Sequence, residues 1–332
     1  MSDSQASLQR KIASAGDLQS VVRTMKALAA SSIGQYEKSV LALGDYYRTV
    51  ELGLGACFRE NAPTARTAER KGQIDSSAIG GIVFGSDQGL AGQFNDVVAD
   101  YAIETLAALP GKPEVWAVGE RVRARLADAG LTVMGLFPVP SSVEAIAPLV
   151  GQIQIESEAE RAKGGYARLY VFHNRPQSGA VYEPVGRRLL PFDSPWQLGM
   201  AQVRWPTANV PEVMHAETTL RALIREYLFI SLFRACAESL ASENATRLAA
   251  MERANKNIDE LVETLHGTFH RIRQSGIDEE LFDVISGFEA LTVTKTAESS
   301  GATQSGATRK PRPLNSLGSY STVRPISIPT RS

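Results

Sequence analysis

The residues best placed to do chemistry lie in a glycine-rich turn, FGSDQGLAGQFN, over residues 84–95. The turn follows a predicted buried strand and precedes a predicted helix, where an α/β fold can bind phosphate through backbone N–H groups. Its glycines, Gly85, Gly89 and Gly92, have neither the dinucleotide-binding nor the P-loop spacing, and no Gly-Lys-Ser/Thr follows. The spacing therefore favours a tight structural turn over a nucleotide site.

A second group of residues has metal-ligand chemistry. Glu263, His266 and His270 stand at helical spacing, so they could share one helix face. No cysteine or third histidine is nearby and there is no His-Glu-x-x-His motif, so a solvated helix face is favoured. His173 follows a predicted strand with no nucleophile near it in the sequence. We predict no catalytic residue, no metal site and no cofactor, which leans away from an independent enzyme.

The composition limits the classes of function that the chain can have. The chain has 332 residues, 43% of them hydrophobic and 21% charged, which allows two domains with apolar cores. Its net charge of −1 gives no case for nucleic-acid binding. No apolar run approaches a membrane span, and the N-terminus has no signal-peptide core. Cys57 and Cys236 are expected to be packing residues in a reducing compartment rather than a disulfide.

The elements that must position these residues begin with a long helix near the C-terminus. No proline occurs between Pro211 and Pro311, and Glu212 to about Leu291 reads as one helix of roughly 120 Å, too long for an ordinary globule. Its apolar residues recur at steps of three and four, the repeat of a left-handed coiled coil. They are Leu220, Leu223, Tyr227, Ile230, Ala237, Ala241, Ala245, Leu248, Met251, Ala254, Ile258, Leu261, Leu265, Phe269 and Ile272.

The N-terminus supplies the partner that such a helix needs. No proline precedes Pro63, and a helix from about Ser7 to Phe58 carries the same apolar step. We expect the two helices to pair antiparallel. Between them, short apolar runs alternate with helical stretches, which predicts a small α/β layer with a largely parallel sheet.

The predicted fold class is thus α/β plus a long antiparallel coiled coil, with a central Rossmann-like domain. We divide the chain into a shaft helix (1–60), a linker (61–77), an α/β domain (78–193), a linker (194–211), a second shaft helix (212–292) and a tail (293–332). The tail is rich in Ser, Thr, Gly, Pro and basic residues, so we expect it to be disordered.

Three sequence motifs then become recognisable. SLASENATRLAAMERANKN (239–257) and RIRQSGIDEELFDVISGFEAL (271–291) resemble the C-terminal helix of the γ subunit of F-type ATP synthases. At the other end, RKIAS (10–14) and VRTMKALAA (22–30) resemble the opening helix of that family. SDQGLAGQFN (86–95) resembles its Ser-Asp-Arg-Gly-Leu-Cys-Gly turn.

The resemblance implies a central-stalk rotor that couples ion flow through a membrane ring of c subunits to ATP synthesis or hydrolysis at the β subunits. The expected partners are the α and β subunits of the hexamer, the ε subunit and the c ring, with no nucleic acid. The implied location is the cytoplasmic face of a bacterial inner membrane, as a peripheral protein. The chain itself would carry no catalytic site.

Matching positions imply exposed contacts between rotor and hexamer, and these are Arg23, Met25, Lys26, Glu243, Asn244, Arg247, Glu279, Glu280 and Asp283. The sequence also departs from the family at Asp278, Glu279, Phe282 and Phe288, which makes this end more acidic and bulkier and puts the usual hydrogen bonds to the β subunits in question. These departures suggest the alternative N-type or sodium-linked bacterial group.

Two other functions stay open at this point. A structural coiled-coil tether with an α/β head shares the periodicity but predicts none of the three motifs. An α/β enzyme that uses the turn at Gly85–Gly92 predicts tight nucleotide binding. For the basic tail, three interpretations stay open. It could brake rotation, it could bind an acidic partner, or it could be an unselected extension.

Overall fold

The computed structural model describes residues 4–60, 78–177, 181–207, 213 and 216–300. The chain divides into two units, one through Phe269 and one from His270, and each is described by itself. The first unit contains the helix α1, the sheet with its covering helices, and the larger part of the helix α8. The second contains the C-terminal part of α8.

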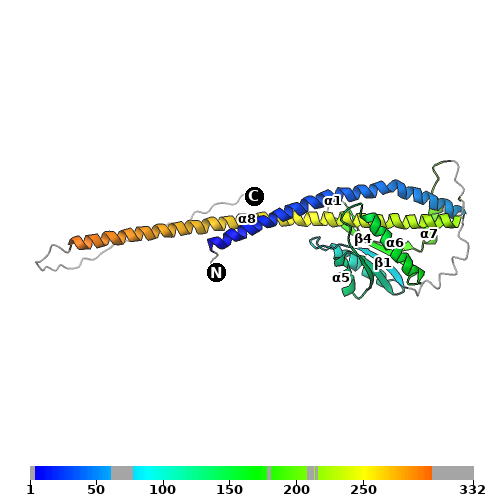
Figure 1. Ribbon diagram of the computed structural model, residues 1–332, viewed down its shortest axis with the longest axis horizontal. Helices are drawn as coiled ribbons and strands as arrows, with labels where there is room; N and C mark the ends of the chain where they lie inside the picture. Colours follow the sequence, from blue (N-terminus) through cyan, green and yellow to red (C-terminus); the bar gives the residue numbers. More distant parts are fainter. Residues whose placement is uncertain (1–3, 61–77, 178–180, 208–212, 214–215, 301–332) are drawn as a thin grey trace, which may run out of the picture. The chain divides into compact units, whose positions relative to one another are not determined.

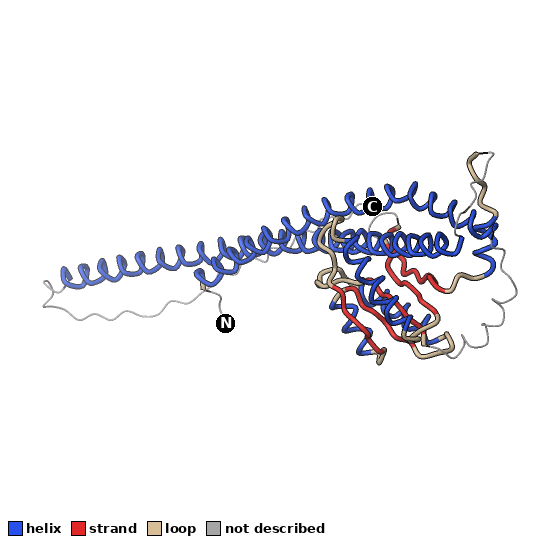
Figure 2. Tube along the Cα trace, turned by 45° about the vertical axis from the view of Figure 1, so that its right-hand side comes forward, coloured by secondary structure: helices blue, strands red, loops and turns tan. Residues whose placement is uncertain are grey.

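The first unit is built on two long helices, α1 (Gln5–Glu60) and α8 (Ala216–Ser300), which lie side by side (Figures 1 and 2). Three polar contacts give their direction. Gln19 bonds to Asp259, Lys26 pairs with Glu252 at 3.1 Å, and Tyr46 donates to Glu226 at 2.6 Å. Residue numbers rise along α1 as they fall along α8, so the predicted antiparallel pairing is confirmed.

Burial along α1 shows the coiled-coil repeat directly. Its buried apolar residues recur every seven positions at Leu8, Ala15, Val22, Ala29 and Tyr36. A strict seven-residue repeat keeps one stripe of the helix against its partner along the whole contact.

The predicted register on α8 needs one correction. The sequence spacing placed Leu261 in the seam, but its side chain is 50% exposed, whereas Val262 packs against Val22, Met251 and Ile258. Steps of three and four both fit the local pattern, and only the partner helix selects between two adjacent apolar residues.

The middle of the chain forms a five-stranded sheet in the order β3-β2-β1-β4-β5. The strands are β1 (Ile79–Phe84), β2 (Pro113–Val118), β3 (Thr132–Phe137), β4 (Arg168–Pro176) and β5 (Tyr182–Leu190). The first four run parallel and β5 pairs antiparallel with β4. The predicted fold class, a largely parallel α/β layer beside a coiled coil, is confirmed.

Helices cover both faces of this sheet (Figure 1). On one face, α4 (Phe94–Ala107) and α5 (Glu120–Asp128) pack on β1 and β2 around the fully buried Val83 and Val98. On the other, α6 (Ile146–Ala162) and residues 228–241 of α8 pack around Phe84 and Trp116. The shaft helix α8 is therefore itself one layer of the α/β domain.

A short helix that the sequence reading missed closes the end of the first unit. α7 (Ser194–Ala201) lies within the predicted linker 194–211 and is capped by Asp193, whose carboxylate accepts from the amide of Trp196 at 3.0 Å. Trp196 stacks on Phe192 and packs edge-on against Phe58 of α1. Tertiary contacts of this kind give so short a helix the apolar partners that it needs.

The described part of α8 begins at Ala216. Its predicted start at Glu212 lies outside the described residues, as do 61–77 and 301–332. The helix is described through Ser300, beyond the predicted end of the shaft helix at 292. Residues such as Thr292, Val293 and Thr294 have only mildly unfavourable helix propensity, and a preceding long helix makes their addition inexpensive. Within the described ranges, no helix is long and apolar enough to cross a membrane.

The second unit presents apolar side chains to solvent. Residues 273–289 of α8 are all exposed, including large apolar ones. These tip residues are Ile277, Leu281, Phe282, Val284, Ile285 and Phe288.

Candidate functional site

The glycine-rich turn between β1 and α4 is closed on itself by hydrogen bonds. The amide of Ser86 donates to Asn95 Oδ1 at 2.9 Å, and Asn95 Nδ2 donates to Ser86 Oγ at 2.8 Å. Ser86 Oγ in turn donates to the carbonyl of Gln88 at 2.9 Å. Leu90 and Gly92 have positive φ angles of 66° and 58°, which tightens the loop. Ser86 and Asn95 thus close the turn through their own hydrogen bonds.

A carboxylate of the chain occupies the position where this edge of the sheet could hold an anion. Asp87 accepts from the amide of Glu120, the first residue of α5, at 2.9 Å, and from the amide of Val139 at 2.8 Å. Backbone amides at a helix N-terminus attract negative charge, and here that charge is supplied internally. This arrangement argues against phosphate binding at the turn and agrees with the structural interpretation of its glycine spacing.

The shaft residues Glu243 and Arg247 lie beside this turn, buried rather than exposed as the family resemblance implied. They form an ion pair at 2.5 Å one helical turn apart, with side chains 6% and 14% exposed. Thr246, between them, would lie 3.7 Å from a Cβ on Gly92. Burial raises the pKa of Glu243, although Arg247 opposes the shift, and Asp87 raises it further. The two opposite charges neutralise each other within the chain, and the turn lies close to the same stretch of α8 at Thr246.

The other predicted contact residues of the shaft divide between seam and surface. Met25 packs in the seam against the cluster of Val22, Met251 and Ile258, so it is not an exposed contact. Asn244 donates to the carbonyl of Leu240 in its own helix at 2.8 Å. Lys26 is ion-paired to Glu252 but remains 45% exposed. Arg23 is exposed on α1.

At the tip, Glu279, Glu280 and Asp283 are exposed on α8, as predicted. They alternate with the exposed apolar tip residues. The tip therefore combines acidic and apolar groups on a single helix, available for a partner of either chemistry.

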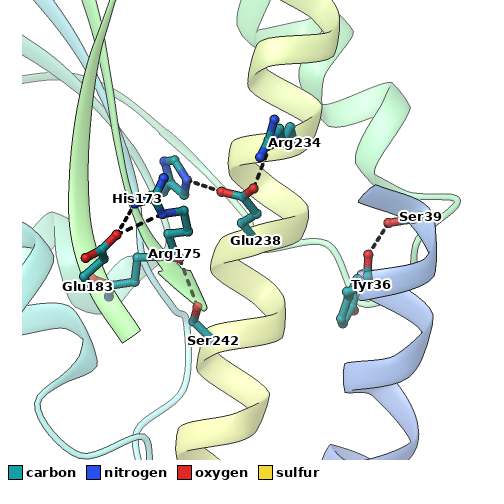
Figure 3. Close-up of polar contacts among 9 residues, drawn as sticks. Tyr36, Ser39, His173, Arg175, Glu183, Arg234, Glu238 and Ser242 are labelled. Atoms are coloured by element: carbon teal, nitrogen blue, oxygen red, sulfur yellow. Dashed lines mark hydrogen bonds and ion pairs between the residues drawn. The ribbon is translucent and has the colours of Figure 1, made fainter. Parts of the chain in front are cut away.

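Sequence reasoning missed one polar contact between β4 and α8. His173 Nε2 lies 2.8 Å from Glu238 Oε2, and both side chains are buried (Figure 3). Arg234 Nε donates to the other oxygen of Glu238 at 2.7 Å. The two main partners are 65 positions apart in the chain, so no local spacing could have indicated the contact. The sequence shows only that no nucleophile lies near His173 along the chain, and that observation does not predict a carboxylate partner.

The remaining candidates carry no comparable geometry. The part of the chain that the structure describes has no cluster of three or more His, Cys, Asp or Glu residues that could hold a metal ion. Cys57 and Cys236 are both buried.

The comparisons with known proteins agree with this arrangement. A sequence model of the family described as ATP synthase matches residues 4–291. The chain belongs to the ATP synthase γ subunit family. The ATP synthase γ chain of Moorella thermoacetica is 27% identical over 294 residues, which cover 86% of this chain and 98% of that protein. The γ chain of Anaeromyxobacter sp. is 25% identical over 304 residues, with coverage of 86% and 98%.

Solved structures show the γ-subunit fold as well. The rotor of the Euglena gracilis mitochondrial ATP synthase matches with a TM-score of 0.58 at 14% identity, over 82% of this chain and 98% of that one. A second structure of that synthase, with its F1 sector and c ring, matches with a TM-score of 0.60 over 88% and 95%. The resemblance predicted from the sequence, to the γ subunit of an ATP synthase, is confirmed.

Proposed function

We propose that this chain works as the turning shaft at the centre of a hexamer of α and β subunits. It has no catalytic site of its own, and transmits torque between a membrane ring of c subunits and the nucleotide sites of the β subunits. The observation that carries the proposal is the antiparallel α1–α8 pair in a chain of the γ-subunit family. A stiff, asymmetric rod meets the mechanical requirement without a catalytic group.

The exposed residues support contacts with the hexamer. Glu279, Glu280 and Asp283 are exposed at the tip among apolar side chains, including Phe282 and Phe288 at 68% and 70% exposure. Large exposed apolar groups near one another are typical of an interaction surface. We retain Arg23, Lys26 and the three acidic tip residues as contact candidates. Met25, Glu243 and Arg247 instead act within the chain.

The remaining parts of the assembly follow from the same proposal. The sheet domain is placed toward the ε subunit and the c ring, which makes the chain a peripheral component on the cytoplasmic face of a bacterial inner membrane. The departures at Asp278, Glu279, Phe282 and Phe288 continue to favour the N-type or sodium-linked group. Either coupling ion is compatible with a shaft that does not itself bind the ion.

Affinity purification of the tagged full chain from its own cells, followed by ATP-driven ion pumping in inverted membrane vesicles, tests the function. We expect the α and β subunits to co-purify. Vesicles from cells without the chain should lose pumping, and its re-expression should restore pumping. A chain that purifies without α and β subunits, with pumping unaffected by its loss, would contradict the proposal. The same vesicles pumped with and without sodium identify the coupling ion.

A further inference from the structure

Two polar contacts join neighbouring residues of β4 to residues one turn apart on α8. His173 meets Glu238 at 2.8 Å, and Ser242 Oγ donates to the carbonyl of Asn174 at 3.0 Å (Figure 3). Residues 238 and 242 lie on the same side of the helix, because four positions make about one turn. We call these two contacts the β4–α8 contact pair.

The surroundings of the contact pair are apolar. Leu240 and Ala241 of α8 belong to the cluster that packs on Val171 of β4. Such packing removes apolar area from water but is non-directional, so it sets little of the angle at which a helix lies on a sheet. Hydrogen bonds have preferred distances and angles. Two of them, one helical turn apart, resist both sliding of α8 along the sheet and rotation about its own axis.

The contact between His173 and Glu238 is fixed in one arrangement by the groups around it. Burial raises the pKa of Glu238, but hydrogen bonds from His173 and Arg234 outweigh it, and the net shift is downward. The carboxylate can then only accept, so the proton of this bond sits on His173 Nε2. His173 Nδ1 is buried without a hydrogen-bond partner among the described residues, which leaves Glu238 as the group that orients the ring. Low solvent access strengthens such a bond.

A second ion pair nearby supplies a comparison. Arg175, two residues after His173 on β4, pairs with Glu183 of β5 (Figure 3). This pair hydrogen-bonds two strands of the sheet to each other, and its side chains are 48% and 37% exposed. Arg175 also lies within electrostatic reach of Glu238, but the Glu183 carboxylate that E183Q neutralises is bonded within the sheet. The pair of Arg175 and Glu183 shares the charge types and the neighbourhood of the contact pair but not its position between sheet and shaft.

We propose that His173, Glu238 and Ser242 are positioning residues that fix the sheet domain to the shaft, so that torque passes between them without slip. This inference rests on the proposed rotor function. A rotor driven at its sheet domain and loaded along its shaft carries the force across the contacts between the two, from α6 and β5 as well as from β4. The buried directional contacts at the β4–α8 boundary are the groups suited to hold its angle, and Arg234 keeps Glu238 aimed at the sheet.

The test uses the complete synthase in membrane vesicles, assembled with the wild-type chain or with E238A, E238Q, S242A or E183Q. Two quantities are measured on assembled complexes: ions pumped per ATP hydrolysed, and the angular fluctuation of the rotor in single-molecule recordings. We expect E238A to reduce pumping per ATP several-fold and to widen the fluctuation. E238Q keeps an oxygen acceptor for His173 and should recover most of both quantities. E183Q should match the wild type.

The outcomes separate the inference from the function on which it rests. E238A complexes that pump and fluctuate like the wild type would overturn the positioning role and leave the rotor function intact. If E238A does not assemble, S242A decides, because it removes one hydroxyl only, and wild-type angular fluctuation in S242A would overturn the role. Failure of the wild-type chain itself to restore pumping would overturn the rotor function.

Discussion

Gly85 and Val122 are in such close contact that a methyl group added to Gly85 would lie 2.6 Å from Cγ1 of Val122 and 2.7 Å from Oδ1 of Asn95. The end of β1 therefore approaches α5 at a point that admits no side chain. Because Val122 is fully buried and β-branched, it cannot rotate away.

We expect Gly85→Ala to lower the free energy of unfolding by about 1–3 kcal/mol, the usual cost of overpacking a core. Urea unfolding of the purified full chain measures this. Gly151→Ala in α6 is the matched control, since a Cβ there meets nothing within 4 Å and should stabilise the helix by about 0.5–1 kcal/mol. Equal behaviour of the two variants would contradict the close contact at Gly85.

Two single substitutions to aspartate, one inside the seam and one outside it, test which residues of α8 face α1. Ile258→Asp places a carboxylate in the seam beside Val22 and Met251, and should cost roughly 3 kcal/mol or more of stability. Leu261→Asp places it on a side chain that is 50% exposed and should change stability by no more than about 0.5 kcal/mol. Thermal unfolding followed by circular dichroism distinguishes them. The register first predicted from the sequence has both residues in the seam, so a loss for Leu261→Asp as large as that for Ile258→Asp would restore it.

Acid titration tests the state of Glu238. Its pKa is lower in the folded chain than the ordinary value of 4.5, so its contribution to stability is fully present above that value and is lost as the pH falls through the lowered one. The free energy of unfolding of the wild type should therefore fall in this acidic window more steeply than that of Glu238→Gln. Parallel pH profiles for the two proteins would show that Glu238 is not held ionised.

The effect of Glu243 on stability should depend on pH in the opposite sense to that of Glu238. Burial raises its pKa while Arg247 opposes the shift, so Arg247→Met should raise it further and leave a buried carboxylate without its cation. Breaking such a pair costs about 3–5 kcal/mol. For a raised folded pKa the penalty grows as the pH rises through that value, so acidification should return part of the stability.

Urea unfolding of the wild type and of Arg247→Met, at neutral and at mildly acidic pH, measures this loss of stability. Lys26→Met is the control, because its partner Glu252 is 54% exposed and such pairs contribute at most about 1 kcal/mol. A loss for Arg247→Met that is the same at both pH values would refute the raised pKa of Glu243.

Local residue patterns predicted most of the fold. The heptad step at Leu8, Ala15 and Val22 predicted a partnered helix, and short apolar runs such as Ile79–Phe84 predicted strands of the sheet. The choice between Leu261 and Val262 was not local, because either residue fits the spacing and the partner helix decides. α7 was missed since its stability comes from Trp196 packing on Phe192 and Phe58.

The site was less predictable for a physical reason. The family resemblance implied that Glu243 and Arg247 are exposed contacts, yet they pair with each other and their side chains are only 6% and 14% exposed. The bond between His173 and Glu238 joins residues 65 positions apart. Burial of polar groups depends on tertiary contacts that residue spacing does not encode.

Direct observation of rotation is the measurement closest to the central claim. Lys112→Cys places a thiol at a side chain that is 70% exposed beside the sheet, and the native thiols of Cys57 and Cys236 are buried. Burial also raises the pKa of Cys236, which keeps that thiol protonated, so a probe attaches selectively at position 112. With the chain assembled into an immobilised α–β hexamer and supplied with ATP, we predict stepwise rotation of the probe in one direction. ATP hydrolysis by that complex with a stationary probe would contradict the account.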